Sequence, residues 1–170
     1  MPLILPVNNI KPKIGNNTFI AENATLSGDI VVGSHCSIWF NAVLRGDVNS
    51  IRIGDYVNIQ DGAIVHCTYQ KTKTIIGDRC SIGHRAIIHG CRLHDHVLIG
   101  MGAIVMDNAI VESYSIVGAG SVVLEDMVVE SGFVYAGTPA KKIRPVTDEQ
   151  RKLLDALPER YVMYSGWYGK

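Results

Sequence analysis

The feature that most constrains this sequence is an aliphatic residue at every sixth position. The series begins at Ile14, shifts by three residues after Leu44 and by five after Val65, loses one residue after Ile88, and ends at Tyr135. Its other members are all aliphatic: Ile20, Leu26, Val32, Ile38, Ile53, Ile59, Ile76, Ile82, Leu93, Ile99, Val105, Val111, Val117, Val123 and Val129. A period of six fits neither a helix nor a simple strand. It is typical of a parallel β-helix, in which three six-residue faces make one coil.

The interruptions of the series support this architecture. Grouping the hexads in threes predicts coils that begin at residues 14, 32, 53, 76, 93 and 111, with a partial coil from 129. Each interruption follows a third hexad, so the loops leave the prism at one corner without disturbing the stack. Gly and Asp recur between the aliphatic positions, as in "IGD" at 53–55 and 76–78, which suits tight corners. We therefore predict an all-β domain, a β-helix of stacked coils, over residues 11–144.

The tail, residues 145–170, predicts a helical segment instead. "TDEQ" at 147–150 has the form of a capping box, with Thr147 as N-cap and Gln150 reaching back. Leu153, Leu154 and Leu157 follow at helical spacing. Pro158 is expected to break or kink the helix. The helix should lie along the prism and cover apolar surface.

Composition excludes several classes of partner. Lys plus Arg equals Asp plus Glu at 16 each, so no net positive field is available to hold a nucleic acid or an anionic membrane surface. No apolar stretch is long enough to span a membrane, and the first residues lack the pattern of a secretion signal. The four cysteines form no CxxC pair, which indicates reduced thiols and a cytoplasmic protein.

Three histidines stand out once the register is fixed. His66 and His89 are each the second residue of a third hexad, in successive coils, and so share one column. Coils about 4.8 Å apart allow two stacked imidazoles to converge on one ion. His84 is the third residue of a second hexad and lies on another face, where a neighbouring subunit could use it. This predicts a homotrimer with three sites, each made of His66 and His89 from one chain and His84 from the next.

The same columns carry other polar residues one coil lower. Arg45 occupies the column of the stacked histidines and Asp61 that of the third histidine, which predicts an ion pair between subunits beneath the metal. Gln60 and Asn58 lie near that edge and are candidates to orient a water or a small substrate. Asp47, in the corner after the third hexad, is expected to hold Arg45 or a histidine in place.

Three segments resemble the gamma-class carbonic anhydrases: "RGDVNSIRIGDYVNIQDGAIVHC", "IGDRCSIGHRAIIHGCRL" and "VLIGMGAIVMD". The resemblance runs over residues 11–144 and implies a left-handed β-helix with His66, His84 and His89 as metal ligands. It implies that the polar residues above surround the site, and that Tyr161 of the tail lies near it. The implied reaction is reversible hydration of carbon dioxide to bicarbonate. Zinc is the expected metal, although imidazoles also suit Fe²⁺ and Co²⁺.

Two features depart from the archaeal enzymes of that family. Val48 stands where they have a glutamate, and the loop "CTYQKTK" after His66 lacks the acidic insertion that they use to shuttle protons. A zinc ion held by three histidines, with its fourth position open to water, generates hydroxide near neutral pH. Because the acidic residues are absent, proton release is the expected slow step. The alternatives are a hexapeptide-type acyltransferase, in which a histidine deprotonates the acceptor of a coenzyme A-borne acyl group, and a noncatalytic metal-binding trimeric module.

Overall fold

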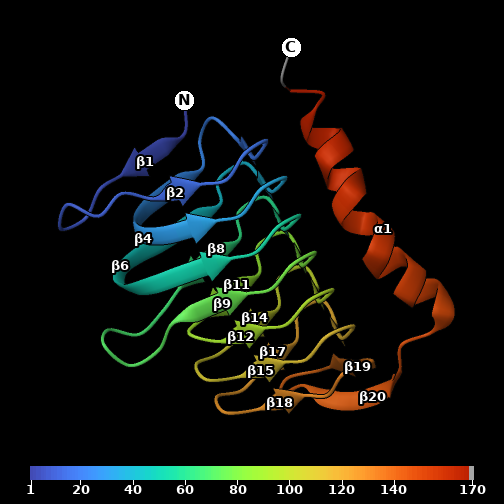
Figure 1. Cartoon of the computed structure of the whole chain (residues 1–170). Helices are drawn as coiled ribbons and strands as arrows, with labels where there is room; N and C mark the ends of the chain where they lie inside the picture. Colours follow the sequence, from blue (N-terminus) through green and yellow to red (C-terminus); the bar gives the residue numbers. More distant parts are fainter. Residues whose placement is uncertain (169–170) are drawn as a thin grey trace.

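The computed structural model describes residues 1–168 as a triangular stack of parallel strands with one long helix beside it (Figure 1). The strands of the first face are β2 (Lys13–Ile14), the end of β4 (Thr25–Val32), the end of β6 (Val43–Ile53), β9 (Thr74–Ile76), β12 (Arg92–Leu93), β15 (Ile110–Val111) and β18 (Val128–Val129). Those of the second face are β3 (Phe19–Ile20), β5 (Ser37–Ile38), β7 (Asn58–Ile59), β10 (Ser81–Ile82), β13 (Leu98–Ile99), β16 (Ile116–Val117), β19 (Phe133–Ala136) and β20 (Lys141–Pro145). Those of the third face are β1 (Leu3–Leu5), the starts of β4 and β6, β8 (Ile64–His66), β11 (Ile87–His89), β14 (Ile104–Val105) and β17 (Val122–Val123).

The predicted register is confirmed on all three faces. Ile53 pairs with Ile76 on the first face, Ile59 with Ile82 on the second, and Val65 with Ile88 on the third. The series members from Leu26 to Val129 are buried and form one continuous core. Burial of each such side chain contributes about 1.5–3 kcal/mol. The period of six therefore exists because every sixth side chain enters the prism.

The "IGD" corners form a ladder of aspartates. Asp55 Oδ1 accepts a hydrogen bond from Ser34 N at 2.7 Å, Asp78 Oδ1 from Asp55 N at 2.8 Å, and Asp95 Oδ1 from Asp78 N at 2.9 Å. The preceding glycine makes room for the carboxylate of the next coil, since a Cβ on Gly54 would lie 2.1 Å from Asp78 Oδ1. Glycine and aspartate thus fasten each coil to its neighbour at this corner.

The helix α1 (Asp148–Ser165) runs along the prism (Figure 1). The predicted capping box is confirmed, with hydrogen bonds in both directions between Thr147 and Gln150. Of the expected break or kink at Pro158, the break does not occur: this residue is buried inside a helix that continues to Ser165. Proline removes only one backbone hydrogen bond, and burial of its ring offsets part of that cost. Arg79 anchors the helix through the Glu159 carboxylate at 2.8 Å.

Two strands lie outside the six-residue pattern. β1 pairs in parallel with the start of β4, so the sheet extends ahead of residue 11. β20 pairs antiparallel with β19, with an irregularity between Val134 and Tyr135. Neither carries the repeat, so the periodicity does not predict them. Within residues 1–168, no helix combines the length and the hydropathy that crossing a bilayer requires.

Candidate metal centre

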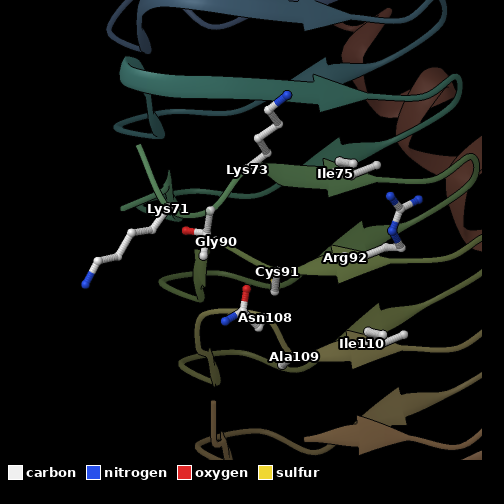
Figure 2. Close-up of a pocket in the computed structure, with 10 residues that line it drawn as sticks. Lys71, Lys73, Ile75, Gly90, Cys91, Arg92, Asn108, Ala109 and Ile110 are labelled. Atoms are coloured by element: carbon white, nitrogen blue, oxygen red, sulfur yellow. The ribbon is translucent and has the colours of Figure 1, made fainter. Parts of the chain in front are cut away.

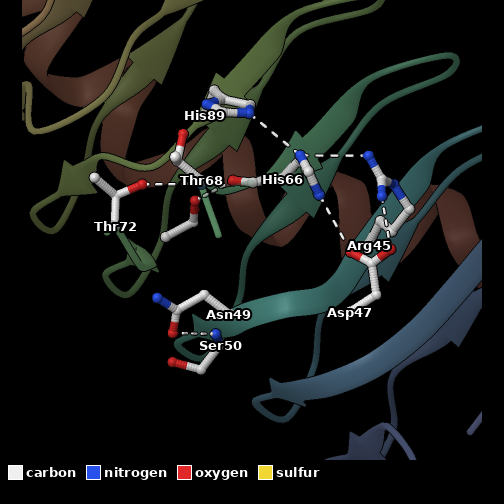
Figure 3. A network of polar contacts seen from close by, with 9 residues as sticks. Arg45, Asp47, Asn49, Ser50, His66, Thr68, Thr72 and His89 are labelled. Atoms are coloured by element: carbon white, nitrogen blue, oxygen red, sulfur yellow. Dashed lines mark hydrogen bonds and ion pairs between the residues drawn. The ribbon is translucent and has the colours of Figure 1, made fainter. Parts of the chain in front are cut away.

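The structure brings His66 and His89 together at the ends of β8 and β11. The two residues are register partners on adjacent coils. His66 Nδ1 lies 3.2 Å from His89 Nε2, and the two rings are tilted by 59° (Figure 3). The stacking expected from the hexad positions is therefore present in a single chain.

A carboxylate on the far side of each ring indicates which nitrogen carries the proton. Asp47 Oδ1 lies 3.2 Å from His66 Nε2, and Asp107 Oδ1 lies 2.7 Å from His89 Nδ1. A carboxylate only accepts hydrogen bonds, so these two ring nitrogens are the donors. The nitrogens that face each other then both carry lone pairs. Two lone pairs at this separation can bind one cation shared by the two rings.

The residues present fit a metal ion. In a tetrahedral zinc site with Zn–N bonds of about 2.0–2.1 Å, two ligand nitrogens are separated by about 3.3 Å. The 3.2 Å between His66 Nδ1 and His89 Nε2 matches that separation. Histidine ligands in metal sites also commonly donate their other N–H to a carboxylate, as both rings do.

Arg45 and Asp47 form the polar edge of this centre. Arg45 Nη1 lies 2.6 Å from Asp47 Oδ2, and Arg45 Nη2 lies 3.5 Å from His66 Nδ1. Burial alone would raise the pKa of the Asp47 carboxyl, but hydrogen bonds from Arg45 and His66 outweigh it and lower that pKa. Burial lowers the pKa of the His66 ring, against the opposing effect of Asp47. The ring is thus neutral and able to bind a metal near neutral pH.

Asp107 is the residue of this centre that sequence reasoning missed. Its carboxylate accepts hydrogen bonds from His89, Thr68 and Thr72. Burial would raise the pKa of Asp107, but the hydrogen bonds from Thr68 and His89 outweigh it and lower that pKa. The sequence does contain one signal for this residue. Met106 lies one coil above His89 in the same column, and Asp107 directly follows Met106.

His84 lies apart from the other two histidines, on the second face. Its Nδ1 is 2.9 Å from Asp61 Oδ2, and its side chain is 46% exposed. Within residues 1–168 of one chain, no three His, Cys, Asp or Glu side chains gather into a metal-binding group. A complete three-histidine site therefore requires a ligand from a second chain.

A hollow of about 330 Å³ lies beside His84 and is lined by Gln60, Tyr161 and the apolar side chains of Leu98 and Met101. Burial raises the pKa of Tyr161, and the nearby charge of Asp61 raises it further. The phenol therefore remains protonated and can donate a hydrogen bond.

Gln60 is held in one orientation by a buried chain of amides. Its Nε2 donates to Asn58 Oδ1 at 2.9 Å, and Asn58 Nδ2 donates to Ser81 Oγ at 2.7 Å. Within residues 1–168 the Gln60 oxygen accepts no hydrogen bond from another side chain, so it is available as an acceptor. Gln60 lines the hollow beside His84, whereas Asn58 is buried behind it between Gln60 and Ser81.

A second hollow, of about 370 Å³, lies at the corner beyond Gly90 (Figure 2). Lys71, Lys73 and Arg92 line it, together with Asn108. None of the three candidate histidines contributes to its wall. It adjoins the candidate metal centre only through Thr72 and Gly90, which also line it.

Comparison with known proteins identifies the family. The repeat family described as bacterial transferase hexapeptide (six repeats) matches residues 11–46 and 90–125. Over 166 residues the chain is 42% identical to a carbonic anhydrase of Geobacillus kaustophilus, covering 98% of this chain and 91% of that protein. It is 38% identical over 164 residues to the mitochondrial gamma carbonic anhydrase 2 of Arabidopsis thaliana, covering 94% of this chain. This chain belongs to the gamma carbonic anhydrase family.

Lengths differ among members of the gamma carbonic anhydrase family, and this chain spans only 59% of the Arabidopsis protein. Among solved structures, a hexapeptide transferase family protein from Anaplasma phagocytophilum is 40% identical, with a TM-score of 0.94 and 98% of both chains covered. Proteins named for carbonic anhydrases and for transferases thus share this repeat. The reaction has to be argued from the site.

Proposed function

We propose that this protein is a metal-dependent carbonic anhydrase of the gamma type, which hydrates carbon dioxide reversibly to bicarbonate at metal sites shared between the subunits of a homotrimer. The observation that carries the proposal is that each candidate ligand has a carboxylate on one ring nitrogen. The pairs are His66 with Asp47, His89 with Asp107, and His84 with Asp61. Such partners orient an imidazole and strengthen it as a ligand through its other nitrogen.

An uncovered apolar face supports the trimer. The outward side chains of the third face form a column of aliphatic residues: Val43, Ile64, Ile87, Ile104 and Val122. Ile64 is 41% exposed in the single chain. Parallel sheets are almost always covered on both faces. This column lies directly beside His66 and His89, so a neighbouring chain that covers it would approach the two histidines.

The residues around the site suit a small apolar substrate. A zinc ion held by three imidazoles supplies, when bound, hydroxide near neutral pH. Leu98 and Met101 give carbon dioxide an apolar wall, and the oxygen of Gln60 accepts a hydrogen bond at the hollow beside His84. Tyr161 lines the same space, where its phenol can donate a hydrogen bond. The buried, free thiols further fit the reducing cytoplasm, which we propose as the location.

The test is stopped-flow hydration of carbon dioxide by protein of measured metal content, loaded with zinc or, without oxygen, with Fe²⁺. We expect activity that His84→Ala abolishes and that rises with buffer concentration, because no acidic shuttle follows His66. A fully metallated trimer without activity would contradict the assigned reaction. Retention of coenzyme A by that trimer would instead favour acyl transfer.

A further inference from the structure

The loop after His66 is tied to both stacked histidines through threonine hydroxyls. Thr68 and Thr72 of this loop donate to the two oxygens of Asp107, which in turn accepts from His89. Thr74, at the start of β9, donates to the backbone oxygen of His66. The same hydroxyl accepts from Gly90 N at 2.9 Å. The segment between His66 and Ile76, which contains the five-residue insertion, therefore supplies the hydrogen bonds behind the metal centre.

Gly90 provides the space in which this network closes. It has a φ of +58°, and a Cβ at this position would lie 2.0 Å from Asp107 Oδ1 and 2.2 Å from Thr72 Oγ1. Any side chain there would displace the carboxylate or the hydroxyl, and it would also be strained at this backbone angle. Glycine directly after His89 is therefore what allows Asp107 to reach the ring.

We propose that Asp107, held over Gly90 by Thr68 and Thr72, is a positioning residue that keeps the proton of His89 on Nδ1 and its lone pair on Nε2. The inference rests on the proposed metal site and explains how one ligand of that site is prepared. A neutral imidazole with no fixed acceptor at Nδ1 can carry its proton on either nitrogen. The form protonated on Nε2 has no lone pair to present toward His66.

Zinc affinity is the first readout, measured by competition with a chelator on the assembled protein. Asp107→Ala should weaken zinc binding about 10- to 100-fold, the usual cost of losing such a partner. Asp107→Asn should lose less, because its amide oxygen still accepts from Nδ1. Gly90→Ala should reproduce the loss although Asp107 is present. Lys71→Ala is the matched control, since this exposed side chain on the same loop points away from Gly90 (Figure 2) and should leave affinity unchanged.

The tautomer of His89 in the metal-free protein is the second readout, observed by ¹⁵N NMR of the imidazole nitrogens. The wild type should show Nδ1 protonated and Nε2 bare, and Asp107→Ala should shift the proton toward Nε2. An Asp107→Ala protein with unchanged affinity and unchanged tautomer would overturn the inference. A wild type that binds no zinc would contradict the proposed function. The NMR comparison of the His89 tautomer in the metal-free wild type and Asp107→Ala proteins would still test the role of Asp107.

Discussion

His84 and Asp61 are paired at 2.9 Å on one face of the prism, whereas His66 and His89 meet on another. Nδ1 of His84 is engaged by the carboxylate, and the side chain remains 46% exposed. Its second nitrogen is thus free to serve a partner. Only an assembly that brings the two faces together completes a set of three ligands.

Mixed trimers give a direct test of this sharing. His66→Ala and His84→Ala should each yield protein without bound zinc, because every interface then lacks one ligand. When the two variants are unfolded and refolded together, one interface of each mixed trimer regains all three histidines. Zinc measured by atomic emission should return in the mixture only. A mixture that stays zinc-free, or a single variant that keeps its zinc, would contradict a site shared between chains.

Arg45→Ala should loosen the trimer. Arg45 pairs with Asp47 of its own chain, and we predict that it also meets Asp61 of the next subunit. Because both contacts of Arg45 would lie within the interface, its loss would leave the two carboxylates without a cation and should weaken each interface by about 1–3 kcal/mol. Sedimentation equilibrium measures the change. Arg52→Ala, which removes an ion pair with Asp29 on the first face, is the control and should leave the assembly intact.

The aspartate ladder should carry measurable stability. Gly54→Ala places a methyl group on the Asp78 carboxylate and should lower the free energy of unfolding by about 1–3 kcal/mol. Asp78→Ala should cost about 1 kcal/mol through the hydrogen bond lost from Asp55 N. Denaturant unfolding gives both values. Glu125→Ala is the comparison, because the exposed Glu125 side chain makes no hydrogen bond to the described residues; an equal loss of stability there would argue against the ladder.

Buried thiols should be unreactive in the folded protein. Burial raises the pKa of Cys80 and of Cys91 to about 12, and that of Cys36 to about 11. At pH 8 a thiol reagent should therefore label the protein only after unfolding. Because an unfolded thiol ionises near about 8.5, this contribution to stability is complete below that pH and is lost as the pH rises toward 12. Cys80→Ala should flatten the alkaline decline in melting temperature; rapid labelling of the native protein would refute the burial.

The period of six was sufficient to predict the coils, the faces and the stacking of His66 on His89, because position within a hexad determines where a side chain points. The capping box likewise predicted the start of α1, since capping depends on neighbouring residues alone. Asp107 was not predictable in this way. Its role depends on a loop conformation and on the space over Gly90, neither of which is periodic. The pairing of Arg45 with Asp47 was anticipated only as one of two options.

β20 has a consequence for the molecule beyond its own pairing. Each coil of the stack offers the next one a row of unpaired backbone groups, and an open last coil would offer the same row to another molecule. β20 covers the edge of β19 in the opposite direction and carries Lys141, Lys142 and Arg144. Positive charge on a terminal strand disfavours further pairing. The stack of coils thus ends in a strand that disfavours end-to-end aggregation.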